Sequence, residues 1–294
     1  MLRLLLSAAL LLSYRAFAAD PLSSEPPLDE AAPAAIVELT MTSDGSRMPG
    51  LAYLASGAGP HPTFVLLHGF PGNEKNLDLA QVMRRAGFNV VFFHYRGAWG
   101  AEGDYRVTQL PDDVAAVLAY LREPDNAESL RIDTDKLSLL GHSLGGWTAL
   151  ATGSRDSDLQ CVGAMAPGNI GQWKAGVAAN DPSATRFLDY ADTLFMLNNF
   201  DSAVLKQELA SAPMESLDIE TFGPQLAGKS VLMVTGDTDP VTPGETIIVP
   251  AEKAYSAVDN LKVRSMIISG DHSFSWSRLA LSRIVLEWAD ADCR

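Results

Sequence analysis

A serine stands between two glycines in the stretch 137-LSLLGHSLGGWTALATGS-154, where an apolar strand is followed directly by a helix. Glycines at positions 141 and 145 suit a sharp turn in which a Cβ would collide with the neighbouring strand and helix. Such a turn projects the Ser143 hydroxyl above the sheet, beside a helix N-terminus that favours negative charge. A serine that merely caps the helix would give the same local pattern. The setting favours Ser143 as a nucleophile.

A serine hydroxyl is inert at neutral pH, so a nucleophilic serine needs a base. The stretch 269-SGDHSFSW-276 places His272 between the last predicted strand and the last predicted helix. This is the carboxyl edge of the sheet, where open α/β sheets build their sites. The other four histidines are less suitably placed. His61 precedes a predicted strand and His94 ends one. His68 lies in a tight turn, and His142 adjoins the serine but is expected to point away from it. Position and elimination therefore favour His272 as the base.

An acid must fix the tautomer of that imidazole and stabilise its cation. The predicted strand 230-SVLMVTG-236 is followed by Asp237 and Asp239, both at the same sheet edge as His272. We expect Asp239, which precedes a proline, to be the acid, and Asp237 to cap the turn, although the reverse assignment stays open. Asp271, next to the base, is expected to be a turn residue.

The developing oxyanion would need hydrogen-bond donors. The turn 68-HGFPG-72 after the third predicted strand can supply the Phe70 amide, and the residue after the nucleophile can supply the Leu144 amide. A tight Gly/Pro turn would have the same sequence, and both roles can hold together.

Strands and helices alternate along most of the chain, which predicts an α/β fold with a doubly wound, mostly parallel sheet. Two strands flank a turn at 43–46, and later strands are expected at 63–69, 88–95, 136–140, 161–166, 230–236 and 262–270. Helices are expected at 76–86, 111–121, 143–152 and 274–289.

The interval 169–228 interrupts this alternation with helical patterns, including 184–199 and 202–211, and is predicted to be an inserted helical cap. Its apolar side chains could form an acyl or alcohol pocket, but their spacing is more typical of a helix face docked on the core (Trp173, Phe195, Met196, Phe200). For Arg96 and Trp99, in YRGAWG, an ion pair and a packed ring are favoured over a role in a pocket.

The motifs HGFPG, FHYRGAWGAEG, GHSLGG, GDTDPVTP and DHSFSWSR occur in an order that resembles the α/β-hydrolase superfamily over residues 36–290. NVVFFHYRGAWGAEGDY and DHSFSWSRLALSRIVLEWA are similar to bacterial members of its serine esterase and acyl-peptidase-like groups. The resemblance implies Ser143 as nucleophile, His272 as base and Asp239 as acid, with Phe70 and Leu144 as backbone donors. The family often has Ser where Ala98 stands, a departure that leaves these residues untouched.

The chain begins with Arg3, an apolar run and Ala16-Phe17-Ala18, a pattern typical of a secretory signal peptide over residues 1–18. An uncleaved anchor is the alternative. Residues 19–34, rich in Pro, Ser and acid, are expected to be a flexible lead-in, and 35–294 to be the α/β-hydrolase domain. We therefore expect export to a periplasm or to the medium.

Acidic residues outnumber basic ones, 36 to 22, which gives a net charge of −14, or −16 without residues 1–18. This balance disfavours nucleic acid and anionic membranes as partners and says nothing of oligomeric state. Cys161 is expected to pack as a small buried residue, with a disulfide to Cys293 as the alternative. Neither cysteine suggests a metal site, and no cofactor is expected.

These observations predict a cofactor-independent serine hydrolase for a small-molecule ester or related acyl substrate. A serine peptidase acting on short or N-acylated peptides is an alternative within enzymes. A binding protein that kept the fold without turnover is the alternative from another class.

Overall fold

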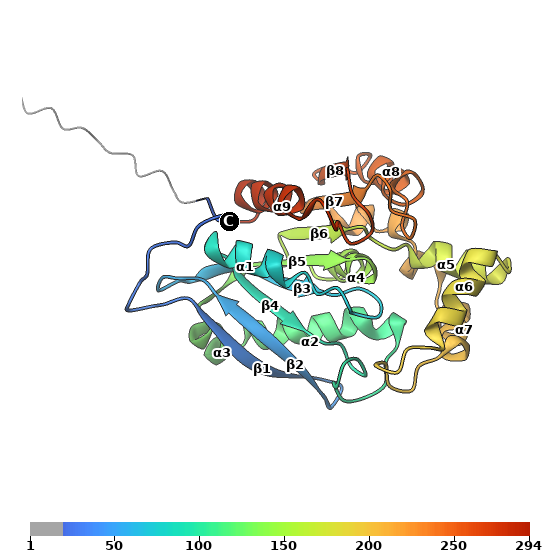
Figure 1. Cartoon of the computed structure of the whole chain (residues 1–294), viewed down its shortest axis with the longest axis horizontal. Coiled ribbons are helices and arrows are strands. Elements are labelled where there is room, and N and C mark those ends of the chain that lie inside the picture. The colour runs from blue at the N-terminus through green and yellow to red at the C-terminus, as the bar shows by residue number, and fades with distance from the viewer. Residues whose placement is uncertain (1–19) are drawn as a thin grey trace, which may run out of the picture.

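Eight strands form one sheet in the computed structural model, which describes residues 20–294 (Figure 1). The predicted signal peptide lies outside these residues. The strands are β1 (Ala35–Ser43), β2 (Ser46–Leu54), β3 (His61–Leu67), β4 (Asn89–Phe93), β5 (Ile132–His142), β6 (Cys161–Met165), β7 (Ser230–Gly236) and β8 (Lys262–Ile268). Their order across the sheet is β1-β2-β4-β3-β5-β6-β7-β8.

Only β2 runs against the others: it pairs with β1 and with β4 in antiparallel register, and every other pair is parallel. The predicted α/β fold with a mostly parallel sheet is therefore confirmed. All residues of β4, β6 and β7 are buried, as expected of parallel strands covered on both faces.

Helices cover both faces of the sheet. The α-helices of residues 20–294 are α1 (Leu77–Arg85), α2 (Leu110–Arg122), α3 (Pro124–Ser129), α4 (Leu144–Gly153), α5 (Ile170–Ala178), α6 (Pro182–Ala191), α7 (Ser202–Ser211), α8 (Gly244–Tyr255) and α9 (Arg278–Asp292). The apolar faces of α1 and α9 share one core with the sheet, and those of α2, α4 and α8 share the other. Within residues 20–294, no helix combines the length and apolar character that crossing a membrane requires.

The interval predicted as a cap holds helices α5, α6 and α7, which lie beyond the carboxyl ends of the central strands (Figure 1). A short segment of it runs beside the loop that follows β4. There the Asn198 amide donates to the Gly97 carbonyl (2.7 Å) and the Trp99 amide donates to the Met196 carbonyl (2.9 Å). Main-chain hydrogen bonds thus attach this segment of the cap to the sheet domain.

Three helix expectations need correction. The pattern expected to be helical over 184–199 is helical only as far as Ala191, where α6 ends, and residues 192–199 lie in turns and irregular chain. Helix α8 is absent from the predicted elements, and it forms although Pro250 lies inside it, where a proline normally disfavours a helix. Helix α9 begins at Arg278 and not at residue 274, because Phe274 is buried in the preceding loop with a positive φ of 55°. The segment 269–277 is consequently a longer loop than predicted.

The segment 20–34, expected to be a flexible lead-in, contacts the folded domain. The Arg85 side chain donates to the Pro21 carbonyl (2.6 Å), and Glu25 forms ion pairs with Arg84 and Arg85. Farther along, the Gly57 amide donates to the Ala32 carbonyl. The described part of the lead-in is therefore bound to the surface.

A disulfide joins Cys161 to Cys293, which corrects the prediction that Cys161 is an unpaired core residue. Cys161 begins β6 and Cys293 directly follows α9, and both are fully buried. Their Cα atoms lie 5.8 Å apart, well within the span of a disulfide. The bond fastens the end of α9 to β6 across 132 residues of sequence.

We predict that Cys293→Ser lowers the free energy of unfolding by about 3–5 kcal/mol, because the unfolded chain regains the entropy of a long open loop. Chemical denaturation of the oxidised protein and the variant measures the difference. Reduced wild-type protein is the control and should lose a similar amount. Equal midpoints for the variant and the oxidised protein would contradict the prediction.

Candidate active site

Ser143 lies in the one-residue connection between β5 and α4. Its backbone has φ 58° and ψ −121°, a strained conformation for a residue with a side chain. A Cβ on Gly141 would lie 1.9 Å from the Gly145 carbonyl oxygen, and one on Gly145 would lie 2.3 Å from the Leu67 carbonyl oxygen. Both positions therefore require glycine, as the sequence pattern predicted. The Ser143 side chain makes no helix-capping hydrogen bond, so its hydroxyl is left for another partner.

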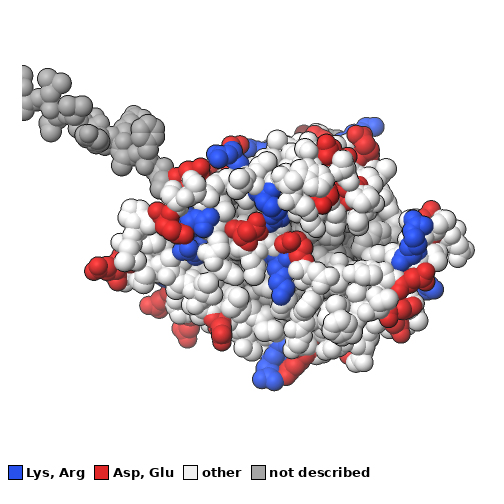
Figure 2. All heavy atoms as spheres, viewed as in Figure 1, with Lys and Arg blue, Asp and Glu red and all other residues white. Residues whose placement is uncertain are grey.

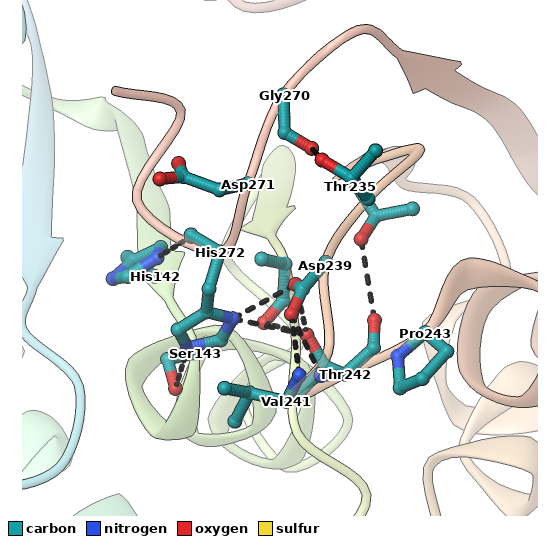
Figure 3. Close-up of polar contacts among 12 residues, drawn as sticks. His142, Ser143, Thr235, Asp239, Val241, Thr242, Pro243, Gly270, Asp271 and His272 are labelled. Carbon is teal, nitrogen blue, oxygen red and sulfur yellow. Dashed lines mark hydrogen bonds and ion pairs between the residues drawn. The ribbon is translucent and has the colours of Figure 1, made fainter. Parts of the chain in front are cut away.

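That partner is His272, whose Nε2 lies 2.9 Å from Ser143 Oγ (Figure 3). His272 comes from the loop between β8 and α9, at the same sheet edge as Ser143. Its other ring nitrogen, Nδ1, lies 2.8 Å from Asp239 Oδ2. The three side chains that sequence reasoning selected thus form one continuous hydrogen-bonded chain.

Asp239 follows β7, and its carboxylate is buried and held on both oxygens. The amides of Val241 and Thr242 donate to Oδ1 at 2.8 and 2.9 Å, and the Thr242 hydroxyl lies 2.7 Å from Oδ2. Burial disfavours the charged carboxylate, but the contacts with His272 and Thr242 outweigh this and lower the pKa of Asp239 to about 2. Asp239 is therefore a carboxylate at neutral pH, oriented toward the imidazole.

The other two aspartates near the base hold turns. The Asp237 carboxylate accepts a hydrogen bond from the Gly270 amide (3.0 Å). Asp271 accepts from the amide and hydroxyl of Ser275 at 2.8 and 2.7 Å. Neither contact involves the imidazole of His272, so the geometry favours Asp239 over Asp237.

Sequence reasoning missed Thr242. Its buried hydroxyl lies 2.7 Å from Asp239 Oδ2, 3.3 Å from His272 Nδ1 and 3.1 Å from the Ala166 carbonyl. It therefore helps to orient the carboxylate. The available signal was the spacing Asp-x-x-Thr, because an aspartate often accepts from amides two and three residues ahead.

The turn 68–72 passes directly beside the serine. A Cβ on Gly69 would lie 2.8 Å from Ser143 Cβ and 3.4 Å from Ser143 Oγ. Within residues 20–294, neither the Phe70 amide nor the Leu144 amide donates a hydrogen bond to another protein group. Two main-chain donors next to Ser143 are thus left for a ligand.

An aromatic surface extends from this turn to the cap. The Phe70 ring lies 5.2 Å from Phe187 of α6, and Phe187 lies 4.4 Å from Trp173 of α5 (ring centroids). Figure 2 shows a hollow between the sheet domain and helices α5–α7 that presents no charged side chain on this face. The site therefore adjoins an uncharged, largely apolar surface.

The cap residues singled out from the sequence divide between two environments. Phe200 is buried against Tyr105 and Phe70, so it packs on the core, but it lies in the non-helical segment between α6 and α7 and not on a helix face. Phe195 is 92% exposed. Trp173 and Met196 are partly buried against the core.

Arg96 and Trp99 make the structural contacts that the sequence favoured. The Arg96 guanidinium forms an ion pair with the buried Asp113 carboxylate and a second with Asp44 (3.3 Å). The Trp99 indole N–H donates to the Pro71 carbonyl at 2.7 Å, which ties the loop after β4 to the turn 68–72. Within residues 20–294, no group of three or more His, Cys, Asp or Glu side chains is placed to hold a metal ion.

Solved structures of similar fold come from several hydrolases. Est1E from Butyrivibrio proteoclasticus matches with a TM-score of 0.66 and 16% identity, over 86% of this chain and 98% of that one. The Pyrococcus furiosus esterase Pf2001 matches with a TM-score of 0.63 and 14% identity, over 89% of this chain and 92% of that one. DcsB, solved in complex with its substrate analogue, matches with a TM-score of 0.67 and 15% identity, over 88% of this chain and 99% of that one. At these identities the likeness concerns the fold.

Curated relatives cover less of the chain. Two Escherichia coli proteins, both described as an uncharacterized 31.7 kDa protein in the traX-finO intergenic region, are 29% identical over 108 residues. The match covers 35% of this chain and spans 36% of the length of each relative.

A model of the alpha/beta hydrolase family matches residues 64–293, a range that includes Ser143, Asp239 and His272. This range covers most of the sheet, the cap and the candidate site. The chain belongs to the alpha/beta hydrolase family.

Proposed function

We propose that this chain is an exported serine hydrolase that cleaves carboxylic ester or related acyl bonds through a covalent acyl-enzyme. The observation that carries the proposal is the linkage of Ser143 Oγ, His272 Nε2, His272 Nδ1 and Asp239 Oδ2 through contacts of 2.9 and 2.8 Å. A nucleophile, a base and an acid in this relation are the arrangement that activates a serine hydroxyl.

In the first half-reaction, Ser143 Oγ attacks the acyl carbon while His272 Nε2 takes the hydroxyl proton. The carbonyl electron pair moves to the oxygen, where the amides of Phe70 and Leu144 stabilise the negative charge. The C–O bond to the leaving group then breaks, and the imidazolium returns its proton to the departing alcohol. The acyl group stays on Ser143.

In the second half-reaction, a water molecule gives a proton to His272 and attacks the acyl carbon. Collapse of this intermediate releases the acid and restores the Ser143 hydroxyl with the proton from His272. The Asp239 carboxylate, ionised because its pKa is about 2, stabilises the imidazolium in both halves. The uncharged aromatic surface beside Ser143 supports an uncharged acyl or alcohol group in the substrate.

Export is proposed from the signal-like pattern of residues 1–18, and the disulfide supports it. Disulfides persist in oxidising compartments such as a periplasm or the extracellular medium. A chain kept in a reducing cytosol would have both cysteines as thiols.

We predict that Ser143→Ala lowers kcat for p-nitrophenyl esters of short uncharged acids by roughly 10⁵-fold. The variant should also lose labelling by a fluorophosphonate, which reacts with activated serines. Ser154→Ala, at the far end of α4, is the matched control and should keep both activities. A folded wild-type protein that neither hydrolyses esters nor takes the label would support the alternative of a binding protein.

We predict that Asp239→Asn lowers kcat by about 10⁴-fold, since the amide cannot stabilise the imidazolium or hold the required tautomer. Asp237→Asn is the matched control. It keeps an oxygen for the Gly270 amide, so kcat should change by no more than about threefold. Steady-state kinetics on both variants decide the assignment, and a larger loss from Asp237→Asn would reverse it.

We predict that the exported chain begins at Ala19 and carries no free thiol. Intact-mass spectrometry of protein recovered from the periplasm or medium, with and without an alkylating agent, measures both properties. A chain that retains residues 1–18 and remains in the cytoplasm would contradict the export proposal.

A further inference from the structure

His142, the residue before the serine, makes a contact that the proposed chemistry does not use. Its Nε2 lies 2.7 Å from the main-chain carbonyl oxygen of His272 (Figure 3). The two imidazole rings lie 4.9 Å apart between centroids, and His142 is only 3% exposed. The last residue of β5 is thus bonded to the backbone of the residue that carries the base.

The direction of this bond follows from its partners. A carbonyl oxygen can only accept, so His142 Nε2 must carry the proton and donate. Burial, reinforced by the neighbouring His272 ring, lowers the pKa of His142 to about 4. The donor is therefore neutral at neutral pH, and it adds no positive charge beside an imidazole that must itself become a cation.

The loop that carries His272 is held at points on either side of it. Before the histidine, the Gly270 amide donates to Asp237 and the Gly270 carbonyl accepts from Thr238. After it, Phe274 is fully buried. His142 provides the attachment at residue 272 itself, and it comes from the same strand end that presents Ser143.

We propose that His142 is a positioning residue for the base: its Nε2–H holds the carbonyl of His272 and so fixes the loop that brings the imidazole to Ser143. The inference rests on the proposed roles of Ser143 and His272. Adjacent residues of the chain then have complementary roles: Ser143 is the nucleophile, and His142 sets the distance between Ser143 and its base, His272.

The expected effect is on the chemical step. The imidazole must stay within hydrogen-bond reach of Ser143 Oγ, and a displacement of about 1 Å can cost roughly 100-fold in rate. The bond lies behind the imidazole, on its own backbone, and involves no group that would touch a substrate. Its loss should therefore lower kcat and leave KM nearly unchanged.

Two substitutions separate the hydrogen bond from the packing of the ring. His142→Gln keeps an N–H donor at similar reach, whereas His142→Leu fills part of the space and cannot donate. We expect His142→Leu to lower kcat for p-nitrophenyl esters about 10- to 100-fold, and His142→Gln to stay within about threefold of wild type. Equal losses in both variants, or a kcat for His142→Leu within twofold of wild type, would overturn the proposal.

His61→Leu is the matched control, because His61 Nε2 also contacts a main-chain carbonyl, that of Gly57, at 3.1 Å. His61 lies at the start of β3, away from the carboxyl edge that carries the site. Its removal should leave kcat within about twofold even if the melting temperature falls. A comparable loss of kcat in His61→Leu would attribute the effect to stability and overturn the proposal.

Hydrogen–deuterium exchange tests the attachment without any substrate. Amides of the segment 269–277 should exchange several-fold faster in His142→Leu than in wild type, and at near wild-type rates in His142→Gln. Unchanged exchange in His142→Leu would overturn the proposal whatever the activity. A protein with the expected exchange pattern but no ester hydrolysis would instead contradict the proposed function.

Discussion

The close approach of helix α4 to the end of strand β5 is the constraint on which the site depends. The approach of α4 leaves no room for a side chain at position 141, and the carbonyls of Leu67 and His68, where β3 ends, leave none at position 145, so both are glycine. The chain must then turn within one residue, and Ser143 accepts a backbone conformation that costs energy on the order of 1–3 kcal/mol. In return, its hydroxyl lies clear of the helix and faces the loop after β8. A side chain at either glycine would force the surrounding backbone to shift.

The second feature of the site is the distribution of charge among the buried side chains around Ser143. The only permanent charge in the hydrogen-bonded chain is the Asp239 carboxylate, whose low pKa depends on donors from the Asp239–Thr242 turn and from His272. His142, which precedes the serine in the sequence, remains neutral at neutral pH because burial lowers its pKa to about 4. A positive charge that arises on His272 would thus face one carboxylate and no competing cation from His142.

Much of this arrangement was predictable because parallel strands deliver their following loops to one edge of the sheet. The positions of Ser143, Asp239 and His272 after β5, β7 and β8 therefore sufficed to bring them together. The remainder depended on contacts that leave little local signal. Thr242 acts through a hydroxyl three residues from Asp239, helix α8 forms despite Pro250, and Phe274 is held in the loop by burial.

The disulfide depended on tertiary structure in the same way, since it joins residues separated by 132 positions. The disulfide also affects what happens when a peptidase cleaves the chain. Both Asp239 and His272 lie between the two bridged cysteines, and so does helix α6, most of whose side chains face solvent. A single cut in that helix would break the backbone, yet the two fragments would stay covalently joined through β6 and the end of α9. The cleaved protein would thus remain one covalently linked molecule that still contains Ser143, Asp239 and His272.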